Sequence, residues 1–412
     1  MKLTFLFLPM LSFVIGRLTL TANADDWPQW RGSNRDGISK EKGLLAEWPD
    51  DGPTLAWKAT GLGVGFSSIA VVKGTIYTLG DMDDGSCVIA LSEKNGNLIW
   101  KSRIGDAGGH KGYPGTRSTP TVDGGQVFAL NQHSDIACVD AVSGKLLWKK
   151  NLVTDFGGKM MSGWKYSESP LVDNDRVICT PGGKDGTLVA LNRKTGAKIW
   201  QTSDWTDTAA YSSIIIATIH GTRQYIQLTG ESVAGVDPDT GKVLWKAGRP
   251  GRTAVITTPV VAGDIVFVTS GYGVGCNGFR ITRKGTGWSS EEIYANTKLA
   301  NHHGGVVLVD GHVYGSTGGT FRCVAIESGE ELFKERSVGK GSTLYAGGRF
   351  ILRSEKGPVA LIEATPEGMK EISKFEQPHR SSARAWPHPV VANGKLYLRD
   401  QDILLSYAVK EK

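Results

Sequence analysis

The sequence predicts an all-β fold: an eight-bladed β-propeller of four-stranded antiparallel blades closed into a ring. First, an apolar strand, a polar turn ending in Gly and a second strand ending in Trp recur about every 43–52 residues, as at 138–148 (CVDAVSGKLLW), a period typical of propeller blades. Second, another phrase recurs eight times, as at 258–267. It consists of a small hydroxyl residue, often with Pro after it, then two apolar residues, a Gly turn and an apolar-aromatic strand. Third, Gly is frequent in turns between Val/Ile/Tyr-rich runs, and no long stretch of helical period occurs after residue 50.

The first element in chain order, residues 1–24, matches a cleaved secretory signal peptide. Lys2 precedes an apolar run over 3–15, and the small-x-small sequence Ala22-Asn23-Ala24 comes after it. The alternative is a membrane anchor, but the apolar run is short and Arg17 interrupts the segment beyond it. No Cys stands at the cleavage point, so lipidation is not indicated. We expect a periplasmic or secreted protein with no transmembrane segment in the mature chain.

The remaining chain divides into an N-terminal extension (25–54), the propeller (55–409) and a short tail (410–412). The strand LAWKA (55–59) precedes every inner-strand phrase, whereas the last such phrase is followed by LLSYAV (404–409) with no Trp strand after it. We therefore predict that these N- and C-terminal strands pair, which closes the ring and removes two free sheet edges. The blade register could differ by one.

The Trp residues that end the repeated phrase are predicted to dock each blade on its neighbour. Each comes after a tight turn whose Gly supplies the positive φ that the hairpin needs. A large flat ring in the next strand suits the gap between adjacent blades. The predicted docking residues are Trp57, Trp100, Trp148, Trp200 and Trp245.

The five Cys residues form no CxxC pair, and Cys138 occupies a repeat position that elsewhere holds Ala or Gly. They are therefore interpreted as small buried thiols and not as a disulfide framework. The chain has a net charge of +6, which falls by two when Lys2 and Arg17 leave with the signal peptide. Its cations are scattered, so binding of nucleic acid is not indicated. No metal site is predicted, because the loop DMDDG (81–85) lacks the later Glu of a calcium loop.

Aligning the eight inner strands predicts a ring of side chains around one mouth of the central channel. These residues stand three places before the Pro of the second phrase or its equivalent: Phe66, Arg117, Ser167, Tyr211, Ile256, His303, Lys340 and Trp386. Glu168, His302 and His388 lie beside these positions in the same strand-entry segments. Aromatic rings together with cations suit an anionic or planar ligand. The alternative is that these residues only pack the rim.

Two longer loops, 105–117 and 156–168, lead toward the same mouth. Each carries an aromatic residue outside the repeat, Tyr113 in the first and Trp164 in the second. Loops on a rigid scaffold commonly carry function, so both residues are candidate ligand contacts. The alternative for Trp164 is that it caps the blade beneath it.

The AxDxxTGxxxW phrases resemble the repeat of the pyrroloquinoline-quinone (PQQ) family of β-propellers. That family includes quinoprotein alcohol dehydrogenases and the propeller lipoprotein of outer-membrane protein assembly. The resemblance covers 55–409, and DWPQWRG (26–32) with GLLAEWP (43–49) looks like the start of secreted bacterial proteins of this group. The chain departs from the dehydrogenases in having no adjacent Cys pair and no recognisable Ca2+ ligands. It departs from the lipoprotein in having no lipidated Cys.

The resemblance and the residues together imply two functions. The first is a secreted, non-catalytic propeller that binds a protein or cell-envelope component through its loop face and channel mouth. It implies no cofactor, no catalytic residue that we can assign, an envelope or periplasmic protein as partner, and a monomer. The alternative is a PQQ-dependent dehydrogenase that oxidises an alcohol or sugar with PQQ and Ca2+. In it, mouth cations hold the quinone carboxylates and Glu168 acts as the base.

Overall fold

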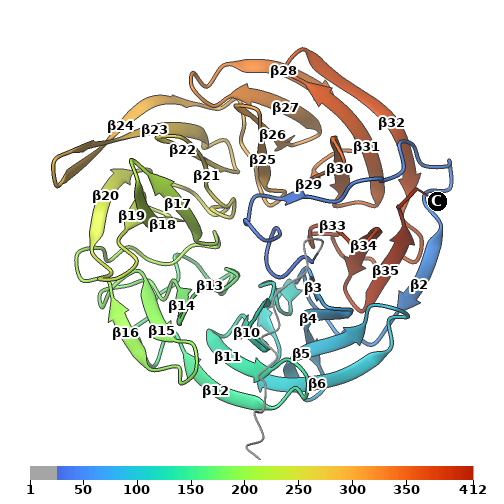
Figure 1. The fold of residues 1–412 in the computed structure, drawn as a ribbon, viewed down its shortest axis with the longest axis horizontal. Helices are drawn as coiled ribbons and strands as arrows, with labels where there is room; N and C mark the ends of the chain where they lie inside the picture. The colour runs from blue at the N-terminus through green and yellow to red at the C-terminus, as the bar shows by residue number, and fades with distance from the viewer. Residues whose placement is uncertain (1–25, 412) are drawn as a thin grey trace, which may run out of the picture.

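The computed structural model describes residues 26–411, which form eight four-stranded antiparallel sheets around a central axis (Figure 1). No helix occurs within that range. The predicted all-β, eight-bladed propeller is therefore confirmed. The signal peptide predicted at residues 1–24 lies outside the described residues, as does Lys412 of the predicted tail.

The first four blades run from the channel outward in chain order. Blade 1 consists of β3 (Ala70–Val72), β4 (Thr75–Met82), β5 (Gly85–Ser92) and β6 (Leu98–Gly105). Blade 2 consists of β9 (Thr121–Asp123), β10 (Gln126–Leu130), β11 (Asp135–Asp140) and β12 (Leu146–Asn151). Blade 3 consists of β13 (Leu171–Asp173), β14 (Arg176–Cys179), β15 (Val189–Asn192) and β16 (Lys198–Gln201). Blade 4 consists of β17 (Ile215–Ile219), β18 (Thr222–Leu228), β19 (Ser232–Val236) and β20 (Val243–Gly248).

The next three blades repeat this order, and the last blade takes its outer strand from the start of the chain. Blade 5 consists of β21 (Val260–Ala262), β22 (Ile265–Ser270), β23 (Gly275–Lys284) and β24 (Gly287–Asn296). Blade 6 consists of β25 (Val306–Val309), β26 (His312–Thr317), β27 (Thr320–Ala325) and β28 (Glu331–Arg336). Blade 7 consists of β29 (Gly341–Ala346), β30 (Arg349–Ser354), β31 (Pro358–Thr365) and β32 (Gly368–Glu376). Blade 8 consists of β33 (Val390–Ala392), β34 (Lys395–Asp400), β35 (Ile403–Ala408) and β2 (Leu55–Ala59).

The ring is closed by the pairing of β2 with β35, as predicted. The antiparallel register places Leu55 opposite Tyr407 and Ala59 opposite Leu404. Ala59, Leu404 and Tyr407 are all buried in one apolar cluster. Because β2 pairs with β35 in one sheet, the edge of β35 that faces β2 is not left unpaired.

The repeated Trp residues lie over the Gly turn of the following blade. The Trp148 indole N–H donates to Arg193 O at 2.8 Å, and its ring covers Gly196, where a Cβ would lie 2.8 Å from the ring. The same arrangement joins Trp57 to Gly96, Trp100 to Gly144 and Trp200 to Gly241. The Gly turn thus supplies both a positive φ and a flat surface for the ring.

Trp245 has a different arrangement. In blade 5 the strands β23 and β24 are longer and no ring covers their Gly285 turn. The Trp245 indole donates instead to Gln224 Oε1 of its own blade at 2.6 Å. The ring still packs in the apolar cluster between blades 4 and 5, together with Val266 and Phe279. It therefore contributes to the same interface by side-chain packing alone.

The hydrophobic core is divided into clusters, most of which join neighbouring blades. One cluster combines Phe128 and Ile136 of blade 2 with Val177 and Val189 of blade 3. The five Cys residues lie inside such clusters or beside them, and all are free and buried. Burial raises the pKa of Cys138 to about 12, so this thiol is unreactive at neutral pH.

Part of the N-terminal extension lies inside the propeller. Residues 27–39, which we call the channel segment, cross the central axis. Trp27 exchanges backbone hydrogen bonds with Val71 in blade 1, and Pro28 O accepts from Val122 N in blade 2. At its far end, β1 (Ile38–Ser39) pairs in parallel with β29 of blade 7. Figure 1 shows this blue stretch lying inside the ring. No repeat covers this stretch, so its course was not predicted.

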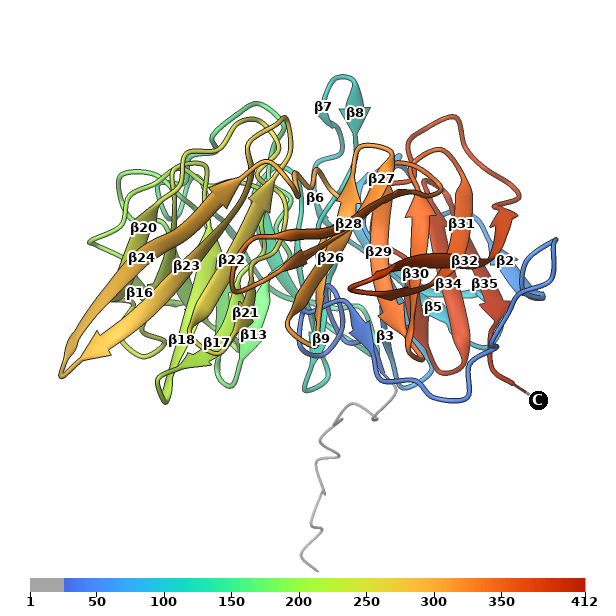
Figure 2. The same ribbon diagram turned by 90° about the horizontal axis from the view of Figure 1, so that it is seen from above.

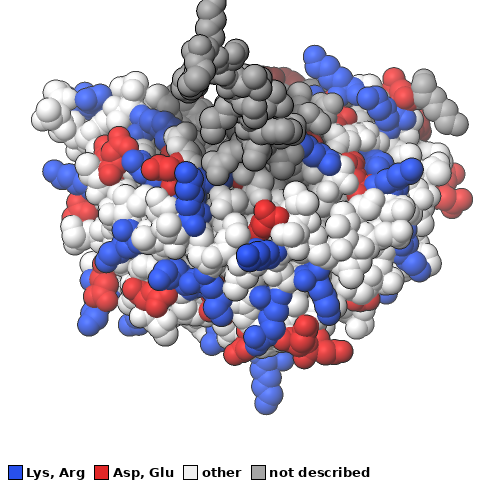
Figure 3. Space-filling model, turned by 60° about the horizontal axis from the view of Figure 1, so that its bottom comes forward, with Lys and Arg blue, Asp and Glu red and all other residues white. Residues whose placement is uncertain are grey.

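The surface carries no large patch of one charge on the face in Figure 3, where Lys and Arg alternate with Asp and Glu. This agrees with the scattered cations of the sequence. Among the described residues, no helix is long and apolar enough to span a bilayer.

Candidate functional site

A cavity of about 270 Å³ opens at one end of the channel, and every blade contributes to it. The eight aligned positions all line it: Phe66, Arg117, Ser167, Tyr211, Ile256, His303, Lys340 and Trp386. The loop residues Tyr113 and Trp164 also line it, as do His302 and His388. The eight aligned side chains meet because each lies one to four residues before the inner strand of its blade, at the same end of the channel.

One wall of the cavity is a continuous aromatic surface. The Trp386 ring lies between Phe66, with ring centroids 4.7 Å apart, and Tyr113, with centroids 4.8 Å apart and planes 29° from parallel. Tyr113 in turn contacts Trp164, whose ring stacks on His110 at 3.9 Å. This wall offers a planar group a large stacking surface.

The charges at the mouth are unbalanced in favour of cations. Glu355 is the carboxylate among the lining residues, and it is already contacted by Lys340 at 3.5 Å, Arg384 at 3.7 Å and the Trp386 indole N–H at 3.1 Å. Arg117 adds a third cation, and no ion pair within 4 Å involves it among residues 26–411. The mouth therefore carries an excess positive charge.

Two buried nitrogen atoms of the lining residues have no hydrogen-bond partner in the described chain. Arg117 donates through Nη2 to Tyr113 O, but its Nη1 is unpaired. His303 Nε2 is likewise buried without a hydrogen bond, and the nearest carboxylate oxygen, Glu355 Oε2, is 3.8 Å away. Desolvation lowers the pKa of Arg117 to about 10, which leaves it charged at neutral pH. An unpaired buried donor is costly, and a ligand oxygen would satisfy it.

The three His residues at the mouth are neutral near pH 7. Burial is the first cause that lowers the pKa of His302 to about 4, and the positive charge of Lys340 is the second. Burial, with Arg31 second, lowers that of His388 to about 3, and burial holds the pKa of His303 well below its ordinary value. Neutral rings with such low pKa values are weak bases, so they serve as hydrogen-bonding walls.

Glu168 does not reach the cavity, which corrects the sequence prediction. It is 2% exposed and accepts hydrogen bonds from Thr180 Oγ1 at 2.7 Å and from the Thr180 backbone N–H. Burial raises its pKa to about 7, partly offset by these donors and by the charge of Arg35. Side chains alternate between the two sides of an extended strand, so one step from Ser167 turns Glu168 away from the mouth.

The channel segment contributes Trp30 to the lining of the cavity. The Trp30 indole N–H donates to Thr258 Oγ1 at 3.0 Å, and its ring lies 4.5 Å from that of His388. His388 Nε2 lies 2.8 Å from His303 O, and this hydrogen bond holds the His388 ring in place. The cavity is therefore lined in part by a residue far away in the sequence from the inner strands.

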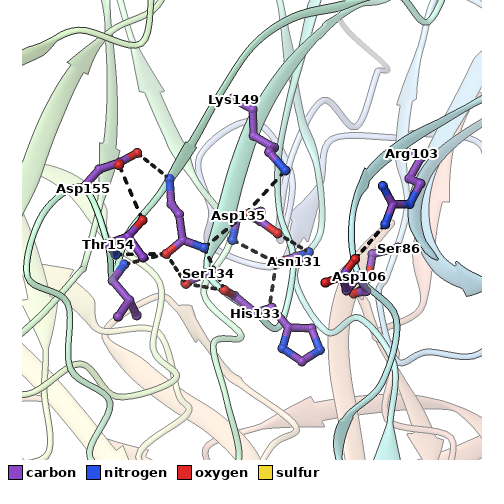
Figure 4. A network of polar contacts seen from close by, with 12 residues as sticks. Ser86, Arg103, Asp106, Asn131, His133, Ser134, Asp135, Lys149, Thr154 and Asp155 are labelled. Carbon is purple, nitrogen blue, oxygen red and sulfur yellow. Dashed lines mark hydrogen bonds and ion pairs between the residues drawn. The ribbon is translucent and has the colours of Figure 1, made fainter.

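The loop 105–117 projects above the ring as the hairpin β7 (Gly109–His110) and β8 (Tyr113–Pro114) (Figure 2). A polar network holds the base of this loop (Figure 4). Arg103 pairs with Asp106 at 2.7 Å, the Asp106 carbonyl accepts from Ser86 Oγ, and His133 Nε2 lies 3.2 Å from Ala107 O. Tyr113 thus reaches the cavity from an anchored support.

Several lining residues were missed by the sequence alignment. They come from positions that no repeat marks: Trp30, Thr253, Ala254, Tyr272, Glu355 and Arg384. The signal for Trp30 was present in the motif DWPQWRG, but nothing in the sequence places that motif at the axis. Glu355 and Arg384 lie in interblade or hairpin loops, whose geometry depends on the folded ring.

The donors present do not fit a calcium ion at this mouth. Ca2+ takes six to eight oxygen ligands, several of them carboxylates. The lining residues offer one carboxylate, Glu355, which cations already occupy. In residues 26–411 no group of three or more His, Cys, Asp and Glu side chains is arranged to hold a metal ion.

Comparisons with known proteins agree with this architecture. The chain is 26% identical over 189 residues to an outer membrane protein assembly factor BamB from Moranella endobia, covering 45% of this chain and 43% of that protein. Indeed, the chain spans less than half the length of the first curated relatives that it matches.

Two solved structures share the fold at low sequence identity. The quinohemoprotein alcohol dehydrogenase from Comamonas testosteroni superposes with a TM-score of 0.67 and 14% identity, over 96% of this chain and 82% of that one. BamB from Moraxella catarrhalis gives a TM-score of 0.60 and 15% identity, over 86% and 99%. A family profile described as outer membrane protein assembly factor BamB matches residues 84–335, more than half of the chain. The protein therefore belongs to this family of PQQ-like propellers.

Proposed function

We propose that the protein is a non-catalytic binding propeller of the cell envelope, which takes up a carboxylate-bearing ring of an envelope component or partner protein at its channel mouth. The observation that carries the proposal is a charged Arg117, whose buried Nη1 has no hydrogen-bond partner, beside the aromatic wall of Trp386, Phe66 and Tyr113. A carboxylate would complete the hydrogen bonding of the guanidinium. The attached ring would lie against Trp386.

The non-catalytic part of the proposal is supported by the chemistry of the lining residues. Glu168 points away from the cavity, Glu355 is held by cations, and the three His rings have low pKa values. None of these groups is poised to remove a proton near pH 7. Relatives named as outer membrane protein assembly factors support this part of the proposal, whereas a relative named as a quinone alcohol dehydrogenase supports the alternative.

We also propose that the protein is exported and acts as a monomer outside the inner membrane. The predicted signal peptide at residues 1–24 and the relatives named for the outer membrane support an envelope location. The five buried free thiols are compatible with an oxidising compartment, because none is exposed to form a mixed disulfide.

The proposal is tested by titrating the protein with aromatic carboxylates and following Trp fluorescence. Trp30, Trp164 and Trp386 all line the cavity, so binding should quench the signal saturably. Arg117→Gln should weaken binding of benzoate about tenfold or more, since a charge-assisted hydrogen bond is lost. Lys145→Gln removes the same charge from an exposed turn and is expected to leave binding unchanged. Equal affinity in both variants, or no binding by the native protein, would reject the proposal.

The second candidate, a PQQ-dependent dehydrogenase, is favoured by one observation: three cations and an aromatic wall would match the carboxylates and the plane of the quinone. The donor set argues against Ca2+ at the same place. The same titration distinguishes the candidates when PQQ is added with and without Ca2+ and an alcohol or sugar is supplied. Turnover that requires both would establish the enzyme and displace the non-catalytic assignment.

A further inference from the structure

We propose that the channel segment is a built-in plug that makes the mouth a blind pocket, and that Trp30 is the residue that limits ligand size. The second part rests on the proposed function, whereas the first does not. A ligand would then enter and leave by the same mouth, and no peptide or polysaccharide would thread through the propeller.

The plug is anchored by two buried arginines on two blades that are not neighbours, blade 6 and blade 3. Arg31 donates to Val306 O in blade 6, and Arg35 donates to Ser169 O and, at 3.0 Å, to Pro170 O before blade 3. They are 3% and 2% exposed. Buried charges are retained only where several acceptors hold them, so these contacts fix the segment across the channel.

The backbone of the segment is held in an uncommon conformation. Arg31 and Arg35 have φ values of 60° and 59°, in the left-handed region that non-Gly residues rarely adopt. Such residues persist where the surroundings determine them, and they concentrate at functional sites. The segment is therefore a specified part of the channel.

The channel has space shaped for this segment. A Cβ on Gly305 would collide with the Arg31 guanidinium and would lie 2.9 Å from His388. A Cβ on Gly37 would lie 2.5 Å from Arg31 Nη2. Any other residue at position 305 would displace Arg31, so a loop of blade 6 and the segment are mutually adapted.

Trp30 joins this anchoring to the pocket. It precedes Arg31, its indole bonds to Thr258, and its ring lines the cavity. Thr258 is 3% exposed and is not among the lining residues, although its hydroxyl contacts Trp30, so we place it behind the Trp30 ring. The depth of the pocket thus depends on one ring, which favours a short ligand with one ring over a longer fused system.

Thiol labelling tests the plug without any ligand. Thr258→Cys places a thiol behind the Trp30 ring, and the native Cys residues at 87, 138, 179, 276 and 323 are buried and give a low background. Adding Trp30→Ala should speed its reaction with a methanethiosulfonate reagent by at least about tenfold. Equal rates with and without Trp30 would overturn the plug. A melting curve for each variant establishes that the ring is folded.

Ligand size tests the role of Trp30. Trp30→Ala should raise the affinity for 2-naphthoate relative to benzoate about tenfold, because the pocket becomes deeper. The matched control, Trp164→Ala at the rim, should weaken both acids alike. An unchanged ratio in Trp30→Ala would overturn the size-limiting role. If no variant binds either acid, the proposed function fails, and the labelling result still decides the plug.

Discussion

At the scale of single residues, one step along the chain separates a side chain that lines the cavity from a buried carboxylate. Ser167 lines the mouth, whereas Glu168 faces the interior and the charge of Arg35. The residues that precede the inner strands could be predicted because the repeat fixes their place at the mouth. The orientation of Glu168 could not, because it depends on Thr180 and on a segment that reaches it only in the folded ring.

The raised pKa of Glu168 gives a pH-dependent stability. Its folded pKa of about 7 lies above the ordinary value of 4.5, so the native state binds the proton more tightly. The resulting stability is fully present below pH 4.5 and is lost as the pH rises through 7. The loss amounts to about 3 kcal/mol at most. Urea unfolding of the native protein should show this decline between pH 5 and 8.

The variant Glu168→Gln should abolish that decline, because the amide resembles the protonated acid and does not titrate. Glu291→Gln, at an exposed site on β24, provides the control with the same chemical change. An identical pH dependence in native protein and Glu168→Gln would show that another group is responsible.

At the scale of strands and turns, the repeated phrase determines how one blade meets the next. The Gly turns and the Trp strand ends could be recognised because both local backbone and packing require those residue types. Blade 5 shows the limit of this reasoning. Its β23 and β24 strands are ten residues long, so their Gly285 turn does not lie under Trp245, and the way in which Trp245 packs there depends on tertiary context.

Replacing Trp148 tests this interface. Trp148→Ala should lower the free energy of unfolding by roughly 3–5 kcal/mol, because a buried ring is removed between blades 2 and 3. Trp148→Phe keeps a ring but loses the 2.8 Å hydrogen bond to Arg193 O, and should cost less. Trp164→Ala in the mouth loop should change stability by well under half as much. Denaturant unfolding of the three variants would decide the ranking.

At the scale of the whole molecule, the ring depends on one seam between β2 and β35. This seam could be predicted because the chain supplies a strand too many at its start and one too few at its end. The channel segment could not be predicted, because its two arginines bond to backbone carbonyls at blades 3 and 6. Every residue has a backbone carbonyl, so the sequence does not indicate which ones act as acceptors.

A charge placed in the seam tests its contribution. Ala59 is 6% exposed opposite Leu404, so Ala59→Asp buries an unpaired carboxylate and should cost about 3 kcal/mol or more. Exposed strand edges should also promote association, visible by size-exclusion chromatography. Lys58→Asp introduces the same carboxylate at the exposed neighbouring position and should remain stable and monodisperse. Equal behaviour of the two variants would mean that the seam is dispensable.

The seam also sets the order of events when the protein is made. Blade 8 joins the first propeller strand to the last, so β2 must wait until nearly all of the chain has been synthesised before it finds its partner. Blades 1 to 7 contain their own four strands and are able to form earlier. Final assembly is then a single late event, and a nascent chain that stalls before β35 exposes two unpaired edges.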